Sequence, residues 1–375
     1  MSNSYLSAIS RFYRRRNRKA AYADNYRYAA DFLTSHPMPQ LTGQEKSDVD
    51  SYWRQYGIRF SDYTWFQMYY GVTGIHDPRF LPNPVAGYML YPYYNDQEKI
   101  AGWDDKNLYQ DMVPQVRFPK ALCHCVRGRL YDGQWNYYDR DEGGLRRLAE
   151  HILDGHTGRD AIMKITSRTY AGKGVRKVPF ASVPEIEKAL LSAATTDFIV
   201  QQTIEQHPFF AQFNASSVNI IRITSWRYKD EIRLFPASLR YGIEGVFTDV
   251  AFRNGQEILN LCGITAEGAL SGHFVTLDGC VSPPPQLSIR QCPNYRLMTD
   301  GIISAHSHIM PFDLIGWDFT FDADGMPVCI EYNVVWPGTI IYQYANGPFA
   351  AEHTDDLLAF LRKPENRQKY VNVNF

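Results

Sequence analysis

The sequence predicts an α+β protein, with two lobes that follow an aromatic-rich and mainly helical N-terminal region. Strand and helix patterns alternate within 116–202, and antiparallel strand pairs dominate 203–349. Residues 1–115 are rich in Tyr, Trp and Phe and poor in long β-branched runs, and 350–375 read as a closing helix and tail. At 375 residues, the chain is long enough for two or three hydrophobic cores.

Composition excludes several classes of protein. Apolar residues make up 45% and charged residues 21%, which is typical of a globular chain. The 39 basic and 40 acidic residues nearly cancel, which argues against a nucleic-acid binder. No apolar run approaches the length of roughly 18 residues that a transmembrane helix needs. The six cysteines are dispersed, which predicts reduced thiols in the cytoplasm.

A basic run at 11–19 lacks the apolar segment of a signal peptide. We interpret it as a solvated helix face or arm. The alternative is peripheral contact with anionic lipid at the inner face of the membrane.

Local patterns predict the elements of the N-terminal region and of the first lobe. Helices are expected at 46–56 and 63–70, and Pro82, Pro84 and Pro92 predict a loop at 81–92. In the first lobe, the predicted strands are 121–126, 161–166 and 198–202, and the predicted helices are 144–154 and 183–193. Cys123 and Cys125 alternate with His124 in a strand, so we expect them to be small core residues rather than metal ligands.

The second lobe is predicted to contain two hairpins around one helix. Strands at 218–228 and 231–241 turn at Lys229-Asp230, and strands at 313–321 and 328–334 turn over 322–325. Residues 295–308 fit a helix, where His306 and His308 read as cations favoured by the helix dipole. Residues 350–362 fit a last helix.

Phosphate-binding chemistry is indicated in the first lobe. Lys164 lies in an apolar strand, where a lysine is costly to bury unless an anion meets it. The basic loop 167–175 follows it and contains Gly172, Lys173 and Gly174. Glycine lets backbone N–H groups approach phosphate oxygens, and the lysine supplies the counter-charge. Lys120 stands before another strand. A plain turn is the alternative for this loop.

Metal-binding chemistry is indicated by the last hairpin. Asp318 lies in its first strand, and Glu331 and Asn333 share one face of its second strand. Folding over the 322–325 turn brings Asp318 close to Glu331 or Asn333. Three oxygen ligands on rigid strands suit Mg²⁺, which keeps substrate phosphates as its other ligands. The alternative is a polar hairpin edge that faces solvent.

These residues resemble the pattern of the ATP-grasp enzymes, most closely the sugar-transfer-associated group related to α-L-glutamate ligases. The resemblance covers about 116–345. It implies an ATP-grasp fold whose two α+β lobes clamp ATP, with Mg²⁺ or alternatively Mn²⁺ as the metal. It further implies the following site residues: for ATP, Lys120, Lys164, Gly172, Lys173, Gly174, Gln201, Gln202, Thr203 and Ile204; for catalysis, Arg222 and Arg240; for substrate, Ser217, Asn219 and Asp249; and for the metal, Asp318, Glu331 and Asn333.

The resemblance implies an ATP-dependent carboxylate–amine ligase that works through an acyl phosphate. Its partners would be a small-molecule, nucleotide-linked or lipid-linked sugar acid and an amine, in surface-polysaccharide biosynthesis. At Gln201 the chain departs from the acidic residue usual in the family, so we expect its amide oxygen to contact the adenine amino group. The alternatives are a phosphotransferase on the same scaffold and a non-catalytic nucleotide-binding partner of a glycan enzyme.

Overall fold

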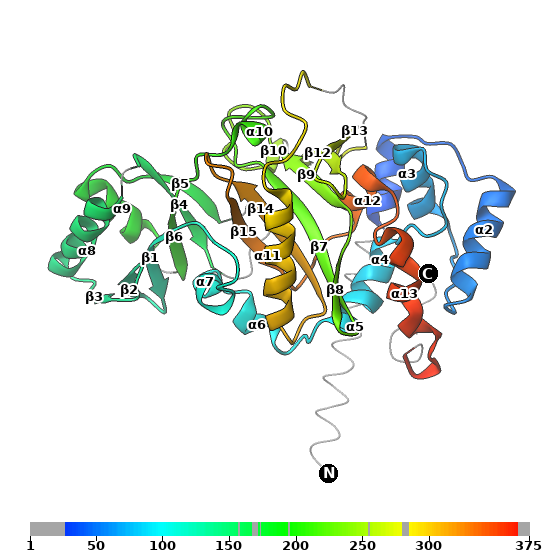
Figure 1. The fold of residues 1–375 in the computed structure, drawn as a ribbon, viewed down its shortest axis with the longest axis horizontal. Coiled ribbons are helices and arrows are strands. Elements are labelled where there is room, and N and C mark those ends of the chain that lie inside the picture. The colour runs from blue at the N-terminus through cyan, green and yellow to red at the C-terminus, as the bar shows by residue number, and fades with distance from the viewer. Residues whose placement is uncertain are drawn as a thin grey trace, which may run out of the picture. The chain divides into compact units, whose positions relative to one another are not determined.

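The computed structural model describes residues 27–156, 158–166, 172, 174–193, 196–253, 256–279 and 285–366. These residues form two compact units (Figure 1). The first contains the chain up to Asn95, a short stretch from His273, and the chain from Gly338 onward. The second begins at Asp96 and ends at Pro337. The domain limits predicted at 115, 202 and 349 stay predictions, and the basic run at 11–19 lies outside the described residues.

The first unit is helical. Its helix α2 begins with a reciprocal cap, in which Thr42 accepts from the Glu45 backbone and Glu45 accepts from the Thr42 backbone. The helices predicted at 46–56 and 63–70 are confirmed as α2 and α3. The elements of this unit are α2 (Gly43–Arg54), α3 (Thr64–Thr73), α4 (Asn83–Val85), the π-helix η1 (Ala86–Leu90), α5 (Tyr91–Tyr94), α12 (Ile340–Asn346), the 3₁₀ turn η2 (Ala351–His353), α13 (Thr354–Leu358) and the 3₁₀ turn η3 (Ala359–Arg362).

The loop predicted at 81–92 is wrong, because α4, η1 and α5 follow one another without a break. Pro84 lies in the first turn of α4, where a backbone N–H would have no helical partner. Pro92 lies in the first turn of α5, directly after the π-helical turn. The wider π turn shifts the hydrogen-bond pattern by one residue, so the missing N–H of Pro92 is tolerated. The prolines therefore begin helical segments here and do not end them.

Gln343 of α12 explains why the C-terminal segment belongs with the N-terminal helices. Its side chain is fully buried, accepts from the Leu81 backbone N–H at 2.7 Å and donates to the Leu81 carbonyl at 2.9 Å. It also accepts from the Phe349 backbone. A buried amide with satisfied partners fixes one arrangement of the segments it joins. The predicted helix at 350–362 is divided, with the short α13 between two 3₁₀ turns.

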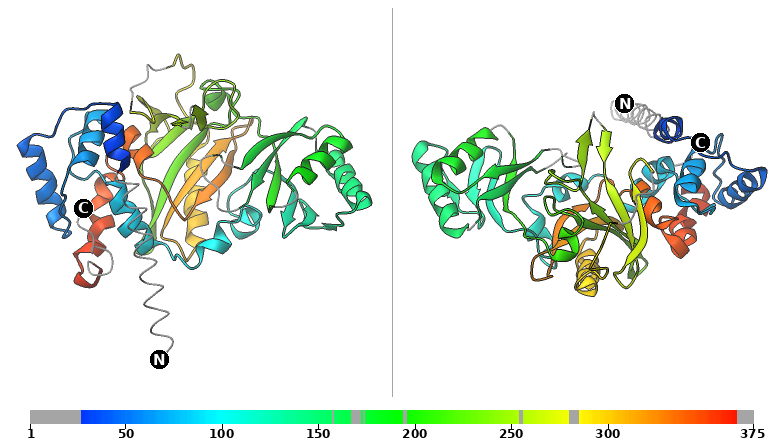
Figure 2. Two further views of the ribbon diagram at one scale, coloured as in Figure 1. Left: turned by 180° about the vertical axis from the view of Figure 1, so that it is seen from behind. Right: turned by 90° about the horizontal axis from the view of Figure 1, so that it is seen from above.

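The first lobe of the second unit is a six-stranded sheet in the order β3-β2-β1-β6-β4-β5. Helices α8 (Glu142–Gly155) and α9 (Val183–Ser192) cover one face of it (Figure 2). Cys123 and Cys125 are fully buried in this core, as predicted. The strands are β1 (Ala121–Val126), β2 (Arg129–Asp132), β3 (Tyr137–Tyr138), β4 (Asp160–Ile165), β5 (Val175–Pro179) and β6 (Phe198–Gln202).

The opposite face of this sheet carries polar groups. His124, Ile199 and Lys164 pair across β1, β6 and β4, so their side chains share one face. Cys123 and Cys125 point to the helices, whereas His124 points away from them. The three side chains therefore do not converge on one metal ion. Burial lowers the pKa of His124 to about 4, so this imidazole is neutral.

The second lobe contains a seven-stranded sheet with the path β13-β12-β9-β7-β14-β15, and β8 pairs with β7. Both predicted hairpins are present. The strand predicted at 231–241 is interrupted at Phe235 and Pro236, and its two halves, β8 and β9, both pair with β7. The elements are α10 (Pro208–Ala211), β7 (Ile220–Tyr228), β8 (Glu231–Leu234), β9 (Ala237–Tyr241), the separate hairpin β10 (Ala251–Arg253) and β11 (Gln256–Ile258), β12 (Asn260–Ile264), β13 (Leu270–Thr276), α11 (Tyr295–His308), β14 (Leu314–Phe321) and β15 (Pro327–Asn333).

Helix α11 lies across one face of this sheet and is fastened there by His306 (Figures 1 and 2). Trp317 donates to the Ser225 hydroxyl at 2.7 Å, and this hydroxyl lies 2.6 Å from His306 Nδ1. His306 Nε2 lies 2.9 Å from the Phe312 carbonyl. Burial lowers the pKa of His306 to about 3. The interpretation of His306 as a cation at the helix end is therefore wrong, since this side chain is a neutral link in the core.

Stability should depend on pH through His306. The folded protein keeps this imidazole neutral well below its usual pKa of 6.5, whereas the unfolded chain protonates it near that value. Its contribution is therefore present above pH 6.5 and is lost as the pH falls towards 3. The free energy of unfolding, measured in urea, should fall between pH 7 and pH 4 in the wild type. In His306→Asn this fall should be smaller by about 3 kcal/mol. His308 is exposed, so His308→Asn is the control and should lose as much unfolding free energy between pH 7 and pH 4 as the wild type. An equal loss in all three proteins would contradict this role of His306.

Candidate active site

Two paired strands place the predicted metal residues close together, and a third strand adds Arg222 beside them. Asp318 of β14 pairs with Glu331 of β15 and, on its other side, with Arg222 of β7. Directly paired residues of antiparallel strands point to the same face, so all three lie on the face opposite α11. Asn333 pairs with Gly316, and its amide nitrogen lies 3.5 Å from Asp318 Oδ2. The structure thus brings Asp318, Glu331 and Asn333 together.

Two arginines continue this row. Arg222 makes a bidentate ion pair with Asp318, in which Nη2 lies 2.5 Å from Oδ2. Its guanidinium also donates to the Pro337 carbonyl at 3.2 Å. Arg240 pairs with Asp249 at 2.7 Å and lies 4.0 Å from Asp318 Oδ1. Burial raises the pKa of the Asp249 carboxyl, and the Arg240 guanidinium opposes that rise. Acidic and basic groups are therefore in contact at the centre of this face, as the ion pairs Arg222–Asp318 and Arg240–Asp249.

Lys106 is a residue of this cluster that the sequence did not reveal. Its ammonium lies 3.1 Å from Glu331 Oε1, and its side chain is only 7% exposed. Its backbone N–H donates to the Thr166 carbonyl at 3.0 Å, next to the end of β4. It lies between the short helices α6 (Ile100–Trp103) and α7 (Tyr109–Met112), in a region that the family resemblance did not cover. A lysine in a polar turn has no pattern that separates it from a surface residue, so only its tertiary contacts identify it.

Lys164 and Lys120 occupy different surroundings. Burial lowers the pKa of Lys164 to about 8, with Glu331 opposing and Lys106 adding to that shift, so Lys164 belongs to the same cluster. Lys120 is exposed, and its ammonium donates to the Gly155 carbonyl at 3.1 Å. The structure therefore groups Lys164 with Lys106 and places the Lys120 ammonium on another partner.

The predicted adenine hinge ends in a buried amide. Gln201 is 6% exposed and donates to the Pro119 carbonyl at 3.4 Å. Its oxygen has no hydrogen-bond partner among the described residues. A buried acceptor without a donor costs about 1–3 kcal/mol, so this oxygen suits a ligand that donates a hydrogen bond. Gln202 donates its backbone N–H to the Lys120 carbonyl at 2.9 Å, and Gln202, Thr203 and Ile204 are half-buried.

The glycine loop is described only in part. Gly172 and Gly174 have φ angles of 71° and 78°, which favour glycine. The Val175 backbone N–H closes the turn onto the Gly172 carbonyl at 3.1 Å. Lys173 and residues 167–171 lie outside the described residues.

Ser217 and Asn219 are buried in a hydrogen-bond network with the protein itself. The Ser217 hydroxyl donates to Asn219 Oδ1 at 2.6 Å. The Asn219 amide donates to the Asn214 and Phe210 carbonyls at 2.8 and 2.9 Å. Gly242 donates its backbone N–H to Asn219. Their observed contacts fasten the loop before β7, and their role towards a substrate stays a prediction.

The donor set fits a metal that keeps other ligands. Across the described ranges, no group of three or more His, Cys, Asp or Glu side chains is arranged to hold a metal ion. Asp318, Glu331 and Asn333 supply two carboxylates and one amide oxygen. Mg²⁺ commonly takes one or two carboxylates and completes its shell with water and phosphate oxygens. The three residues therefore fit Mg²⁺ bound together with a nucleotide.

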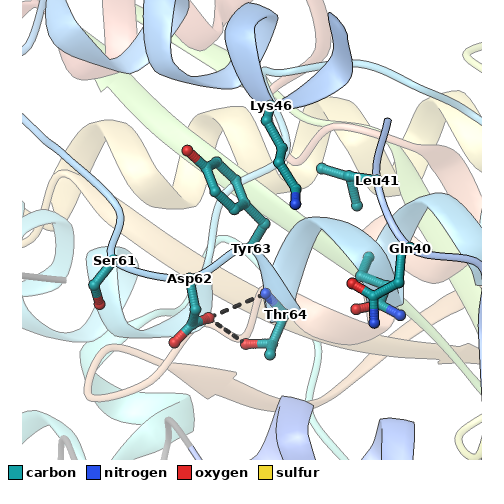
Figure 3. Close-up of a pocket in the computed structure, with 8 residues that line it drawn as sticks. Gln40, Leu41, Lys46, Ser61, Asp62, Tyr63 and Thr64 are labelled. Carbon is teal, nitrogen blue, oxygen red and sulfur yellow. Dashed lines mark hydrogen bonds between the residues drawn. The ribbon is translucent and has the colours of Figure 1, made fainter. Parts of the chain in front are cut away.

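A cavity of about 330 Å³ lies in the first unit (Figure 3). Asp62 accepts there from the backbone N–H and the hydroxyl of Thr64. The Lys46 ammonium lies 5.6 Å from the centre of the Tyr63 ring. None of the residues that line this cavity belongs to the predicted site.

Comparison with known protein families assigns this chain to the ATP-grasp class. Residues 88–356 match the family described as sugar-transfer associated ATP-grasp, and the chain belongs to this family. The predicted α+β class and ATP-grasp fold are confirmed. Comparison with curated proteins finds no significant match.

Solved structures with a similar fold are only distantly related. D-alanyl-alanine synthetase A from Vibrio cholerae is 13% identical with a TM-score of 0.43, over 74% of this chain and 68% of that one. The VanG D-Ala:D-Ser ligase from Enterococcus faecalis is 13% identical with a TM-score of 0.45, over 72% and 64%. N5-carboxyaminoimidazole synthetase from Staphylococcus aureus, complexed with ADP, is 10% identical with a TM-score of 0.36, over 64% of this chain. The chain spans 47% of that synthetase.

Gly316 should be required for the shape of this face. A Cβ atom there would lie 2.8 Å from the Pro337 carbonyl oxygen, and this oxygen also accepts from Arg222. Gly316→Ala should lower the free energy of unfolding in urea by about 1–3 kcal/mol. Gly102→Ala, with open space at the same atom, is the matched control and should lose no stability. Equal stabilities of the two variants would contradict this packing.

Proposed function

We propose that the protein is an ATP- and Mg²⁺-dependent carboxylate–amine ligase. The observation that carries this proposal is the row of ion-paired charges from Asp249 to Glu331, with Lys106 and Lys164 beside its carboxylate end. Such a row can hold a triphosphate, a metal and a reacting carboxylate within one water-poor site. Membership of the ATP-grasp family supports this class of reaction.

The residues divide the work by their chemistry. Asp318, Glu331 and Asn333 would hold Mg²⁺ or Mn²⁺, which supplies charge neutralisation at the phosphates. Lys106 and Lys164 would neutralise the phosphate chain from the other side. The amide oxygen of Gln201 would accept from the adenine amino group, and backbone groups of Gln202, Thr203 and Ile204 would border the base.

The reaction would proceed in two steps. The substrate carboxylate attacks the γ-phosphate, ADP leaves, and an acyl phosphate forms. The amine then attacks the carbonyl carbon, phosphate leaves, and the amine proton passes to solvent or a nearby base. Arg222 and Arg240 would stabilise the acyl phosphate, since a guanidinium fork matches phosphate oxygens. Asp249 would lie on the acceptor side through its contact with Arg240.

A sugar acid is the carboxylate that we propose, activated as a small molecule or as a nucleotide- or lipid-linked form and joined to an amine. The description of the family as sugar-transfer associated supports this choice. The product would be an amide in a surface polysaccharide, made in the cytoplasm or at the inner face of the membrane.

A substrate screen tests the reaction class. The full chain is incubated with ATP, Mg²⁺, nucleotide-linked uronic acids and amino acids, and ADP and phosphate are measured. A ligase should release free phosphate only when both acid and amine are present. A phosphotransferase would leave the phosphate on its product, and a non-catalytic partner would bind ATP without turnover, so either result would replace this proposal.

Glu331→Gln should remove turnover and preserve the fold. The loss of one carboxylate charge at the metal should lower kcat by at least about 100-fold, measured as ADP release, with an unchanged circular dichroism spectrum. Glu150→Gln makes the same chemical change in an exposed ion pair on α8 and should keep full activity. Full turnover by Glu331→Gln would exclude this residue as a metal ligand.

Lys106, Lys164 and Lys120 can be compared by nucleotide affinity. The family resemblance predicts Lys120 as a phosphate ligand, whereas the observed contacts favour Lys106. Lys106→Met and Lys164→Met should raise the Kd for a non-hydrolysable ATP analogue with Mg²⁺ at least about tenfold, measured calorimetrically. Lys120→Met should change it less than about threefold. A tenfold loss with Lys120→Met would restore the assignment from the sequence.

A further inference from the structure

Each carboxylate that we propose as a metal ligand already has a cationic side chain of the protein as its partner. Asp318 holds Arg222 through both of its oxygens. Glu331 holds Lys106 at 3.1 Å through Oε1. Both cations are no more than 10% exposed, and Asp318 is 7% exposed, whereas Glu331 is 26% exposed. A divalent ion entering alone would meet two positive charges at its two carboxylate ligands.

The two cations differ in how firmly the protein holds them. The Arg222 guanidinium has a further acceptor in the Pro337 carbonyl at 3.2 Å. The Lys106 ammonium lies close to Glu331 but makes no well-aligned hydrogen bond among the described residues. A buried ammonium with unsatisfied N–H groups favours the arrival of an anion with several oxygens. Lys106 is therefore the cation that is ready to change partner.

A triphosphate supplies what a metal ion alone lacks. Its oxygens can accept from a displaced ammonium, and its charge offsets the repulsion between the metal and the two cations. It also completes a metal shell to which Asp318, Glu331 and Asn333 would contribute two carboxylates and one amide oxygen. Metal and triphosphate thus each remove an obstacle to the binding of the other.

We propose that Lys106 is a placeholder cation: its ammonium occupies Glu331 and so weakens the binding of a free divalent ion there. When a triphosphate binds, the Lys106 ammonium moves to the phosphates and leaves Glu331 to the metal. This inference rests on the proposed metal site. Lys106 acts here as a positioning residue for Glu331, together with Arg222 on Asp318. By reciprocity, the nucleotide must strengthen metal binding by the same factor by which the metal strengthens nucleotide binding.

Manganese binding to the full chain tests this inference without turnover. Free Mn²⁺ is measured by electron paramagnetic resonance during titration, with and without a non-hydrolysable ATP analogue. The wild type should bind Mn²⁺ alone at least about 100-fold more weakly than in the presence of the analogue. Lys106→Met should bind Mn²⁺ alone at least about tenfold more tightly than the wild type, because the competing charge is gone.

Matched variants separate the charge from the packing. Lys106→Arg keeps a cation and should restore weak binding of Mn²⁺ alone. Lys106→Gln serves as a second neutral variant if Lys106→Met fails to fold. Lys177→Met removes a lysine from a partly exposed ion pair with Asp160 in the same lobe and should bind Mn²⁺ alone as the wild type does.

The outcomes distinguish this inference from the proposed function. If the wild type binds Mn²⁺ alone as tightly as with the analogue, or if the neutral Lys106 variants bind it no better than the wild type, the placeholder role is overturned while the metal site stands. If no Mn²⁺ binds even with the analogue, the proposed metal site itself fails.

Discussion

The ion pair between Asp318 and Arg222, which are also direct cross-strand neighbours, is the constraint on which the charged face of this sheet depends. Buried charges are tolerated only when opposite charges lie within contact distance, so Asp318 requires Arg222. Glu331 is a second carboxylate directly opposite Asp318, and it has Lys106 as its counter-charge. Arg240 and Asp249 extend the row on β9 and the loop that follows it, and Lys106 ends it at Glu331. A β-sheet suits such a row, because register fixes the spacing of side chains on one face.

The other face of the same sheet explains how this polar row is supported. Residues that alternate with Asp318 along β14 point to α11, and Trp317 joins it through Ser225 to the neutral imidazole of His306. One strand therefore carries a charged face and a core face, separated by the two-residue period. This packed back holds the strands that carry the charged groups in position.

Residues of the first lobe and of the segment at 96–116 lie close to the carboxylate end of the row. Lys164 lies on the sheet face that α8 and α9 leave uncovered, and the Lys106 backbone is hydrogen-bonded next to the end of the same strand. Lys106, Lys164 and Glu331 consequently influence one another electrostatically. Most cations of the site are thus already paired with carboxylates of the protein. Binding of a metal and a nucleotide would therefore replace some of these ion pairs by contacts between the cations and the phosphates and between the carboxylates and the metal.

The sequence by itself determined the elements whose signal is local. The hairpin with Asp318, Glu331 and Asn333, the strand at Lys164 and the helix at 295–308 follow from alternation, turn residues and periodicity, and the structure has them. Tertiary structure alone decided the rest. Pro84 and Pro92 lie in the first turns of helical segments, where their missing N–H is tolerated, and Gln343 binds the preceding Leu81 from a distant part of the chain, which no local propensity reveals. Lys106 reaches Glu331 across more than two hundred residues of chain. Such contacts depend on which surfaces are buried together, and single-residue patterns do not contain that information.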